Sequence, residues 1–236
     1  MYPYKGNIYL CPFSDSQLYN DTLNKSKFWL NENFYEVNLS SIYGQAYEHY
    51  ISQPIVGSIS PYCLLSQIMT KYEIDFTTVS LESLRSFEIP LEWHAQYTGL
   101  VHGVAGWFDV VFPSNNLEIV EQENILSTSP YVSGTHWHQI RFLLPKPIAM
   151  NQNQVLIGKM KWEANDQRSY DLSIELHLRG TDIYMKQNYR LNDQQYCYNY
   201  INNNPSPPLP SLQLFQERAL NPLENDHSKF EAFSLY

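Results

Sequence analysis

Two segments of this chain alternate strictly between apolar and polar residues, a pattern that predicts half-buried β-strands. In the first, every second residue from 87 to 93 is apolar, and the pattern returns from 170 to 178. Successive side chains of a strand point to opposite faces, so a period of two places one face in a core and the other in water. The sequence therefore predicts antiparallel strands with one solvated face.

The β pattern extends from about residue 71 to 178. The run 107–112 is nearly apolar on both faces, which is typical of a central strand, and Asn165-Asp166 lies where a hairpin turn is expected. Many short strands, with helices kept to one end of the chain, indicate a barrel or a sandwich.

Two helices are expected ahead of the strands. Ser14 and Gln17 form a capping pair that predicts a helix to about Asn24, and a second helix is predicted from Ser41 to Ser52. The segment 27–39 between them is rich in aromatic residues without a regular period, which favours a docking patch over a place in the core. After residue 180 the signal fades, and the Asn/Pro-rich run 202–210 is expected to be extended or disordered.

Charge and composition exclude several classes of function. A formal net charge of −9 argues against direct nucleic-acid binding, which needs basic surface to displace counterions. The sequence has no apolar run of about 18 residues and no signal-peptide pattern, so neither a membrane span nor secretion is expected. Three scattered cysteines suggest a reducing, intracellular compartment. With nine glycines and no Gly-x-Gly, the chain lacks a glycine-rich loop for a nucleotide or a methyl donor.

The densest group of candidate functional residues is Thr135-His136-Trp137-His138. On a strand, His136 and His138 would share a face and could bind a metal, but no third ligand is evident nearby, so no metal site is predicted. Polar or catalytic histidines and simple packing beside Trp137 both remain open from the spacing.

Several runs resemble one family, the protein arginine methyltransferases. The run 126–130 followed by 135–137 is similar to the family's "LSTxP … THW" signature, and 107–110 resembles the strand before it. Other runs are similar to the coactivator-associated branch: 10–19, 46–56, 99–103, 164–165, 168–174 and 205–208. The segment 113–125 departs from the family by being longer.

The resemblance implies a mainly β fold: an antiparallel β-barrel with an inserted helical dimerisation arm and a disordered Pro/Asn-rich tail. The implied divisions are a first strand and helix in 1–21, the arm in 22–43, the barrel substrate domain in 44–180 and a C-terminal extension in 181–236.

Site residues follow from the resemblance alone. It implies that His136 and Trp137 lie in the active site, and that substrate is contacted by Thr135, Tyr198 and Tyr200. It also implies that the arm docks through Trp29, Phe34, Tyr35 and Leu39. No cofactor-binding residue is assigned.

The expected function is the substrate-binding and dimerisation half of a type I protein-arginine N-methyltransferase. The full-length family uses S-adenosylmethionine and a pair of glutamates, and this chain carries neither part, so we expect it to be inactive and mostly monomeric alone. The implied partners are arginine-containing proteins such as histones and, through the arm, a second copy of the enzyme, in nucleus and cytoplasm. The alternatives are a non-catalytic adaptor barrel that binds methyltransferase subunits or basic peptides, and an unrelated barrel that binds sugars or metal through His136 and His138.

Overall fold

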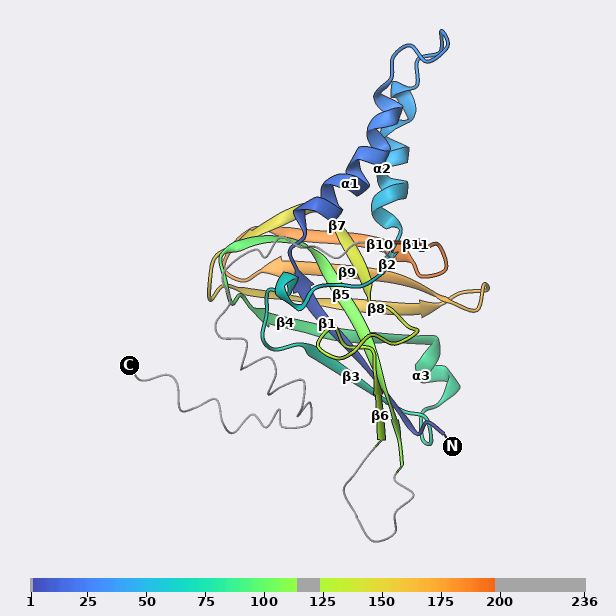
Figure 1. Cartoon of the computed structure of the whole chain (residues 1–236), viewed down its shortest axis with the longest axis vertical. Coiled ribbons are helices and arrows are strands. Elements are labelled where there is room, and N and C mark those ends of the chain that lie inside the picture. Colours follow the sequence, from blue (N-terminus) through green and yellow to red (C-terminus); the bar gives the residue numbers. More distant parts are fainter. Residues whose placement is uncertain (1, 114–123, 198–236) are drawn as a thin grey trace.

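The computed structural model describes residues 2–113 and 124–197, which form two β-sheets and a projecting helical hairpin (Figure 1). The larger sheet has the order β11-β2-β7-β5-β1-β3, with β6 also paired to β5. Its strands are β1 (Lys5–Phe13), β2 (Ile55–Val56), β3 (Thr70–Asp75), β5 (Gly99–Phe112), β6 (Asn124–Ser127), β7 (Ile140–Met150) and β11 (Gln195–Tyr196).

The smaller sheet has the order β10-β9-β8-β4 and is antiparallel throughout. Its strands are β4 (Ser86–His94), β8 (Val155–Ala164), β9 (Tyr170–Leu178) and β10 (Tyr184–Arg190). A short helix, α3 (Leu81–Arg85), leads into β4. The β8–β9 connection is the predicted hairpin, closed by Asn165 N–H donating to Ser169 O at 2.9 Å.

The mainly β prediction is confirmed, and the alternating segments are β4 and β9. Residues Ile89, Leu91 and Trp93 of β4 are almost fully buried, while the residues between them are exposed. These side chains join those of β9 and β7 in a core between the two sheets. The sheets approach each other where β3 meets β4 and where β7 meets β10. Among the described residues no backbone strand pairing joins them, but Tyr189 OH of β10 donates to Leu143 O of β7 at 2.6 Å.

A second core lies on the other face of the larger sheet, under the helices. The hairpin consists of α1 (Ser16–Lys27) and α2 (Tyr43–Ser52), joined through the 3₁₀ turns η1 (Phe28–Leu30) and η2 (Ser40–Ile42). Leu18 and Ile51 bury their side chains against Trp107 and its neighbours in this second core. A further 3₁₀ turn, η3 (Pro61–Cys63), closes one side of it. Beyond this base the hairpin extends away from the sheets (Figure 1).

The start of α1 differs from the expected cap. Asp15, not Ser14, is the capping residue, and its Oδ1 accepts the Leu18 N–H at 2.9 Å. Ser14 Oγ instead lies 3.3 Å from His102 Nδ1. Asp15 therefore caps the helix with its carboxylate, while the Ser14 hydroxyl lies beside the buried His102 ring. No helix among the described residues is long and apolar enough to cross a membrane.

Candidate functional site

The loop 128–139 fills a gap along one edge of the central strand β5. Along that edge, β7 pairs with residues 99–106 and β6 pairs with residues 109–112. The two residues between these pairings, Trp107 and Phe108, face the ends of the loop. The loop therefore has both of its ends attached to one rigid strand.

Thr128 attaches the first end of the loop to β5. Its N–H donates to Phe108 O at 3.0 Å, and its hydroxyl donates to the same carbonyl at 2.8 Å while accepting the Phe108 N–H at 3.0 Å. Thr128 is 2% exposed, so these bonds are shielded from water. The side chain thus continues the sheet's hydrogen bonding where the strand pairing stops.

Gln139 joins the two ends of the loop. Its Nε2 donates to Thr128 O at 2.7 Å, and its Oε1 accepts the Ile59 N–H at 3.0 Å. Its own carbonyl accepts the Gly57 N–H at 3.0 Å. A Cβ at Gly57 would lie 2.1 Å from Cys197 O, so only glycine allows the neighbouring strand to approach this closely. We call the Thr128–Gln139 bond the loop clamp.

The middle of the loop presents its side chains to solvent. Thr135 is half-buried, and its hydroxyl accepts the Trp137 N–H at 3.2 Å and donates to Trp137 O at 3.0 Å. Trp137 is 51% exposed, although its ring makes edge contacts with Phe108 and with exposed His136. A fixed base and an exposed aromatic tip are the features of a surface that receives a ligand.

The strand geometry supposed for the two histidines is wrong. The segment 135–139 is irregular, and β7 begins only at Ile140. His138 is half-buried with Nδ1 3.4 Å from Ser58 Oγ, whereas His136 is exposed. Across residues 2–113 and 124–197, no group of three or more His, Cys, Asp or Glu side chains could hold a metal ion.

The predicted arm residues lie at the tip of the hairpin and differ in how far their side chains are exposed. Tyr35 is 87% exposed and Phe34 is 38% exposed, and their rings form a chain of edge contacts with Phe28. Trp29 and Leu39 are half-buried within the tip. Phe28, at 49% exposure, was missed as a candidate, although its place beside Trp29 in an apolar run was the available signal.

A polar cluster holds the base of the hairpin. His102, almost fully buried on β5, accepts the Asp15 N–H through Nδ1 at 3.2 Å and packs its ring against Tyr19. Burial lowers the pKa of His102, partly opposed by the Asp15 carboxylate. Tyr19 OH in turn donates to Pro145 O at 2.8 Å, which ties α1 to β7. The neutral histidine therefore helps to set the direction of α1.

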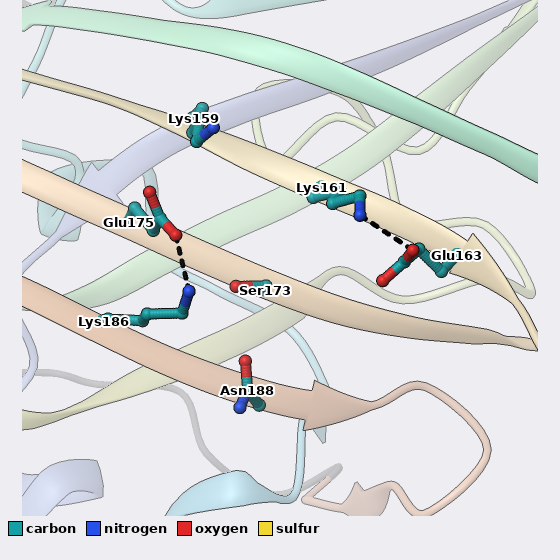
Figure 2. Close-up of a pocket in the computed structure, with 7 residues that line it drawn as sticks. All are labelled: Lys159, Lys161, Glu163, Ser173, Glu175, Lys186 and Asn188. Atoms are coloured by element: carbon teal, nitrogen blue, oxygen red, sulfur yellow. Dashed lines mark hydrogen bonds and ion pairs between the residues drawn. The ribbon is translucent and has the colours of Figure 1, made fainter.

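A hollow of about 390 Å³ on the outer face of the smaller sheet is a poor candidate for a ligand site (Figure 2). Lys186 and Lys161 lie within it, but they pair with Glu175 at 2.7 Å and Glu163 at 2.8 Å. The hollow is lined by side chains that already bond one another in water, so it has the character of a solvated face. Tyr198, Tyr200 and most of the lengthened segment 113–125 lie outside the described residues.

Comparison with known proteins decides the family. A family model described as the arginine methyltransferase oligomerization subdomain matches residues 4–182, which include the hairpin, the loop 128–139 and most of both sheets. The chain belongs to the protein arginine methyltransferase family. Its resemblance to the coactivator-associated branch is confirmed by relatives named histone-arginine methyltransferase CARMER.

The CARMER proteins of Drosophila virilis and, as a probable enzyme, Drosophila melanogaster are each 38% identical to the chain over 199 residues. That match covers 84% of this chain but 36% of each relative, so the chain spans little more than a third of their length.

Two solved structures of the family share the fold. One is from the Trypanosoma brucei PRMT1 enzyme–prozyme heterotetrameric complex with AdoHcy, with a TM-score of 0.66 and 24% identity over 81% of this chain and 57% of that chain. The other is Arabidopsis thaliana protein arginine methyltransferase 10, with a TM-score of 0.67 and 20% identity over 81% and 60%. At these identities the likeness shows the fold alone.

Proposed function

We propose that the chain is the substrate-facing and oligomerising part of a type I protein-arginine N-methyltransferase acting on histones and other nuclear proteins. Membership of the family and relatives named histone-arginine methyltransferases support this reaction. The observation that carries the proposal is the loop itself: Trp137 and His136 are exposed at the tip, while Thr128 and Gln139 clamp the base.

Each residue of the tip has a distinct task in this proposal. The Trp137 ring offers a flat face against which a guanidinium and its aliphatic stem can pack. The exposed imidazole of His136 bonds a carboxylate that grips the guanidinium from the cofactor-binding domain. Thr135 holds the turn through its two bonds to Trp137. Such positioning accounts for several kcal/mol of the barrier reduction when both reactants are held together.

The methyl donor binds elsewhere in this proposal. S-adenosylmethionine, which supplies the methyl group in the family, needs a glycine-rich loop before a helix, and the chain has no Gly-x-Gly. The residues that lead from β1 into α1, Phe13-Ser14-Asp15, also contain no glycine. The residues present therefore do not fit the donor, and this chain acts only beside a cofactor-binding domain.

The hairpin is the oligomerisation element of this proposal. Its exposed aromatic tip docks on the cofactor-binding domain of a second subunit, which closes a dimer. The two facing sheets act as one barrel wall for the substrate, with contacts at the β3–β4 and β7–β10 margins in place of backbone strand pairing. The proposal also places the protein in the nucleus and cytoplasm, as its resemblance to the family implies.

Fusion to a cofactor-binding domain tests the proposal. The donor domain comes from the Drosophila melanogaster CARMER relative, joined ahead of residue 1, and methyl transfer to histones is measured with labelled S-adenosylmethionine. We expect turnover by the fusion and none by the chain alone. A correctly folded fusion that binds the donor but does not methylate any histone or arginine-rich protein would contradict the proposal.

A non-catalytic adaptor is the second candidate, and the exposed tip residues Phe28, Phe34 and Tyr35 favour it, since docking needs the hairpin but not the loop. Added to a complete methyltransferase, an adaptor changes the rate of that enzyme. Substitution of Tyr35 by serine then abolishes the effect, whereas substitution of Trp137 by alanine leaves it unchanged.

A further inference from the structure

A row of polar side chains crosses four strands of the larger sheet, on the opposite face of β5 from Trp137. In the strand register Ser127 lies opposite Asp109, Asp109 opposite Asn7, and Asn7 opposite Glu73. Directly paired residues share a face with their Cβ atoms about 4.5–5.5 Å apart. We call these four residues the polar row. Phe108, which contacts Trp137, precedes Asp109 and therefore points to the other face.

The two central residues of the polar row are buried but incompletely bonded. Asp109 is 4% exposed and Asn7 is 6% exposed, and the Oδ1 atom of each has no hydrogen-bond partner. Hydrogen bonding from Ser127 and Tyr9 lowers the pKa of the Asp109 carboxyl group, but its Oδ1 atom remains without a partner. Buried acceptors without donors are rare in proteins and cost about 1–3 kcal/mol each. Two of them side by side indicate a missing donor.

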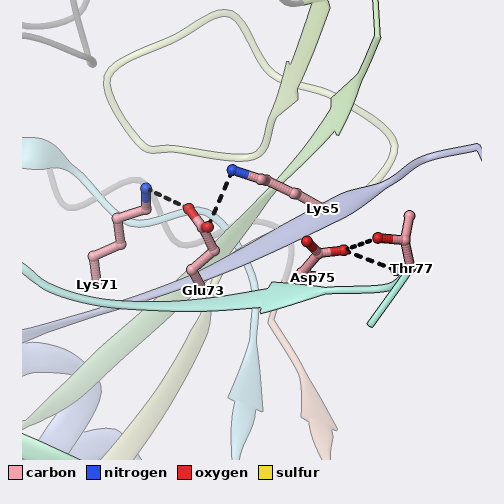
Figure 3. Close-up of polar contacts among 5 residues, drawn as sticks. All are labelled: Lys5, Lys71, Glu73, Asp75 and Thr77. Atoms are coloured by element: carbon pink, nitrogen blue, oxygen red, sulfur yellow. Dashed lines mark hydrogen bonds and ion pairs between the residues drawn. The ribbon is translucent and has the colours of Figure 1, made fainter. Parts of the chain in front are cut away.

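Two lysines near the polar row already form ion pairs with Glu73, the last residue of the row. Lys5 and Lys71 each lie 3.2 Å from a different oxygen of Glu73, as Figure 3 shows. Glu73 is therefore paired with a cation on both sides, whereas no described cation forms an ion pair with Asp109, although the charge of Lys71 favours its ionised form. Burial raises the pKa of Asp109, and hydrogen bonding from Ser127 and Tyr9 together with the charge of Lys71 only partly opposes this effect. The row thus combines one satisfied carboxylate with one that would gain from a positive charge.

An aromatic pair lies next to the unsatisfied acceptors. The rings of Tyr9 and Trp107 stack with centroids 6.1 Å apart and an angle of 13° between their planes. Tyr9 and Lys5 are half-buried, so the rim of the row consists of side chains that can move aside. A planar cation with several N–H groups matches two adjacent acceptors beside aromatic rings better than a compact ammonium does.

We propose that the polar row binds one arginine side chain of a protein partner, whose guanidinium donates to Asp109 Oδ1 and Asn7 Oδ1 and lies against the Tyr9–Trp107 pair. The bound arginine is a docking contact and not the methylated one, since the row and the exposed Trp137 occupy opposite faces of β5. The inference therefore stands independently of the proposed reaction.

A peptide titration tests the proposal on the full chain. The probe is acetyl-Gly-Gly-Arg-Gly-Gly-amide, with the lysine peptide as its counterpart, and binding is followed by amide NMR shifts. We expect saturable shifts at Asn7 and Asp109 with the arginine peptide and weaker binding of the lysine peptide. Substitution of Asp109 by asparagine should raise Kd about tenfold or more, the loss of one charge-assisted hydrogen bond.

Two control variants separate this site from the others. Glu163→Gln removes a carboxylate from the outer face of the smaller sheet, and Trp137→Ala removes the tip of the loop; neither should alter the shifts at Asn7. The proposal is overturned if the shifts are confined to residues 135–137 and vanish in Trp137→Ala, or if the wild-type chain shows no saturable shift at Asn7. The wild-type map decides the matter even if Asp109→Asn does not fold.

Discussion

Gln139 Nε2 donates to Thr128 O at 2.7 Å, and this bond joins the two ends of the twelve-residue connection between β6 and β7. It can hold the loop in place because both residues are also bonded elsewhere. Gln139 is anchored to Ile59 and Thr128 to Phe108. The segment Thr135–Trp137, in which His136 and Trp137 are exposed, is therefore carried by a base that is bonded to the sheet.

Substitution of Gln139 by leucine should lower the free energy of unfolding by about 1–3 kcal/mol. Leucine keeps much of the volume but leaves the buried Thr128 carbonyl and Ile59 N–H without their side-chain partner. Urea unfolding measures the change. The matched control is Gln152→Leu, at an exposed position between β7 and β8, which should stay within about 0.5 kcal/mol of wild type. Equal stability of Gln139→Leu and wild type would show that the clamp is not formed.

Substitution of Tyr35 by serine should reduce self-association of the chain with little change in melting temperature. Tyr35 is 87% exposed at the hairpin tip, so its removal costs almost no buried area but takes away an adhesive aromatic surface. Light scattering across protein concentrations measures the effect. As a control, Phe13→Ala in the second core should cost about 3–5 kcal/mol, because Phe13 is fully buried. A large loss of stability in Tyr35→Ser would mean that the tip packs against the sheets.

Acidification should destabilise the chain through His102. Its pKa is lowered by burial, partly opposed by Asp15, so its contribution to stability is present above the ordinary histidine pKa of about 6.5 and is lost as pH falls through the lowered value. The other groups that face the ring are Ser14, Ser16 and Tyr19. Melting temperatures from pH 7.5 to 5 should fall more steeply for wild type than for His102→Gln. His94→Gln, at an exposed position, should follow wild type.

Replacement of Asp109 by asparagine should stabilise the chain near pH 8. The pKa of Asp109 is raised by burial, so its favourable contribution is complete at low pH and is lost as pH rises through that raised pKa. An asparagine carries no charge and can donate to Asn7 Oδ1, which should add about 1–3 kcal/mol to the unfolding free energy. Thermal unfolding at pH 8 and pH 4 measures the difference, which should shrink at pH 4. A destabilised variant at both pH values would contradict the burial argument.

The sequence predicted the alternating strands well because burial and period coincide in them. Ile89, Leu91 and Trp93 are buried as the pattern required. The same reasoning cannot find Arg141, a charged residue between apolar neighbours of β7 that is nevertheless 1% exposed. The second core beneath the hairpin makes both faces of β7 interior, and a local pattern cannot report a helix that returns from far along the chain.

The candidate site was also predictable only in part. The residue types of the segment 135–137 marked it as a candidate site. Its irregular backbone could not be predicted, because the strand pairing that ends at β6 and resumes at Ile140 depends on partners in β5. Nothing in the sequence marked Thr128 and Gln139 as site residues, because their roles come from hydrogen bonds to residues elsewhere in the chain. Asn7 and Asp109 lie 102 positions apart and become neighbours only through strand register.

His136→Ala in the fusion with a cofactor-binding domain tests whether the exposed tip of the loop orients the reacting groups. Turnover number and melting temperature are measured together, with His138→Ala as the control. We expect kcat to fall about 10²–10⁴-fold in His136→Ala, with an unchanged melting temperature and unchanged binding of the methyl donor, and a milder kinetic effect in His138→Ala. A His136→Ala fusion that melts several degrees lower yet turns over normally while folded would contradict it.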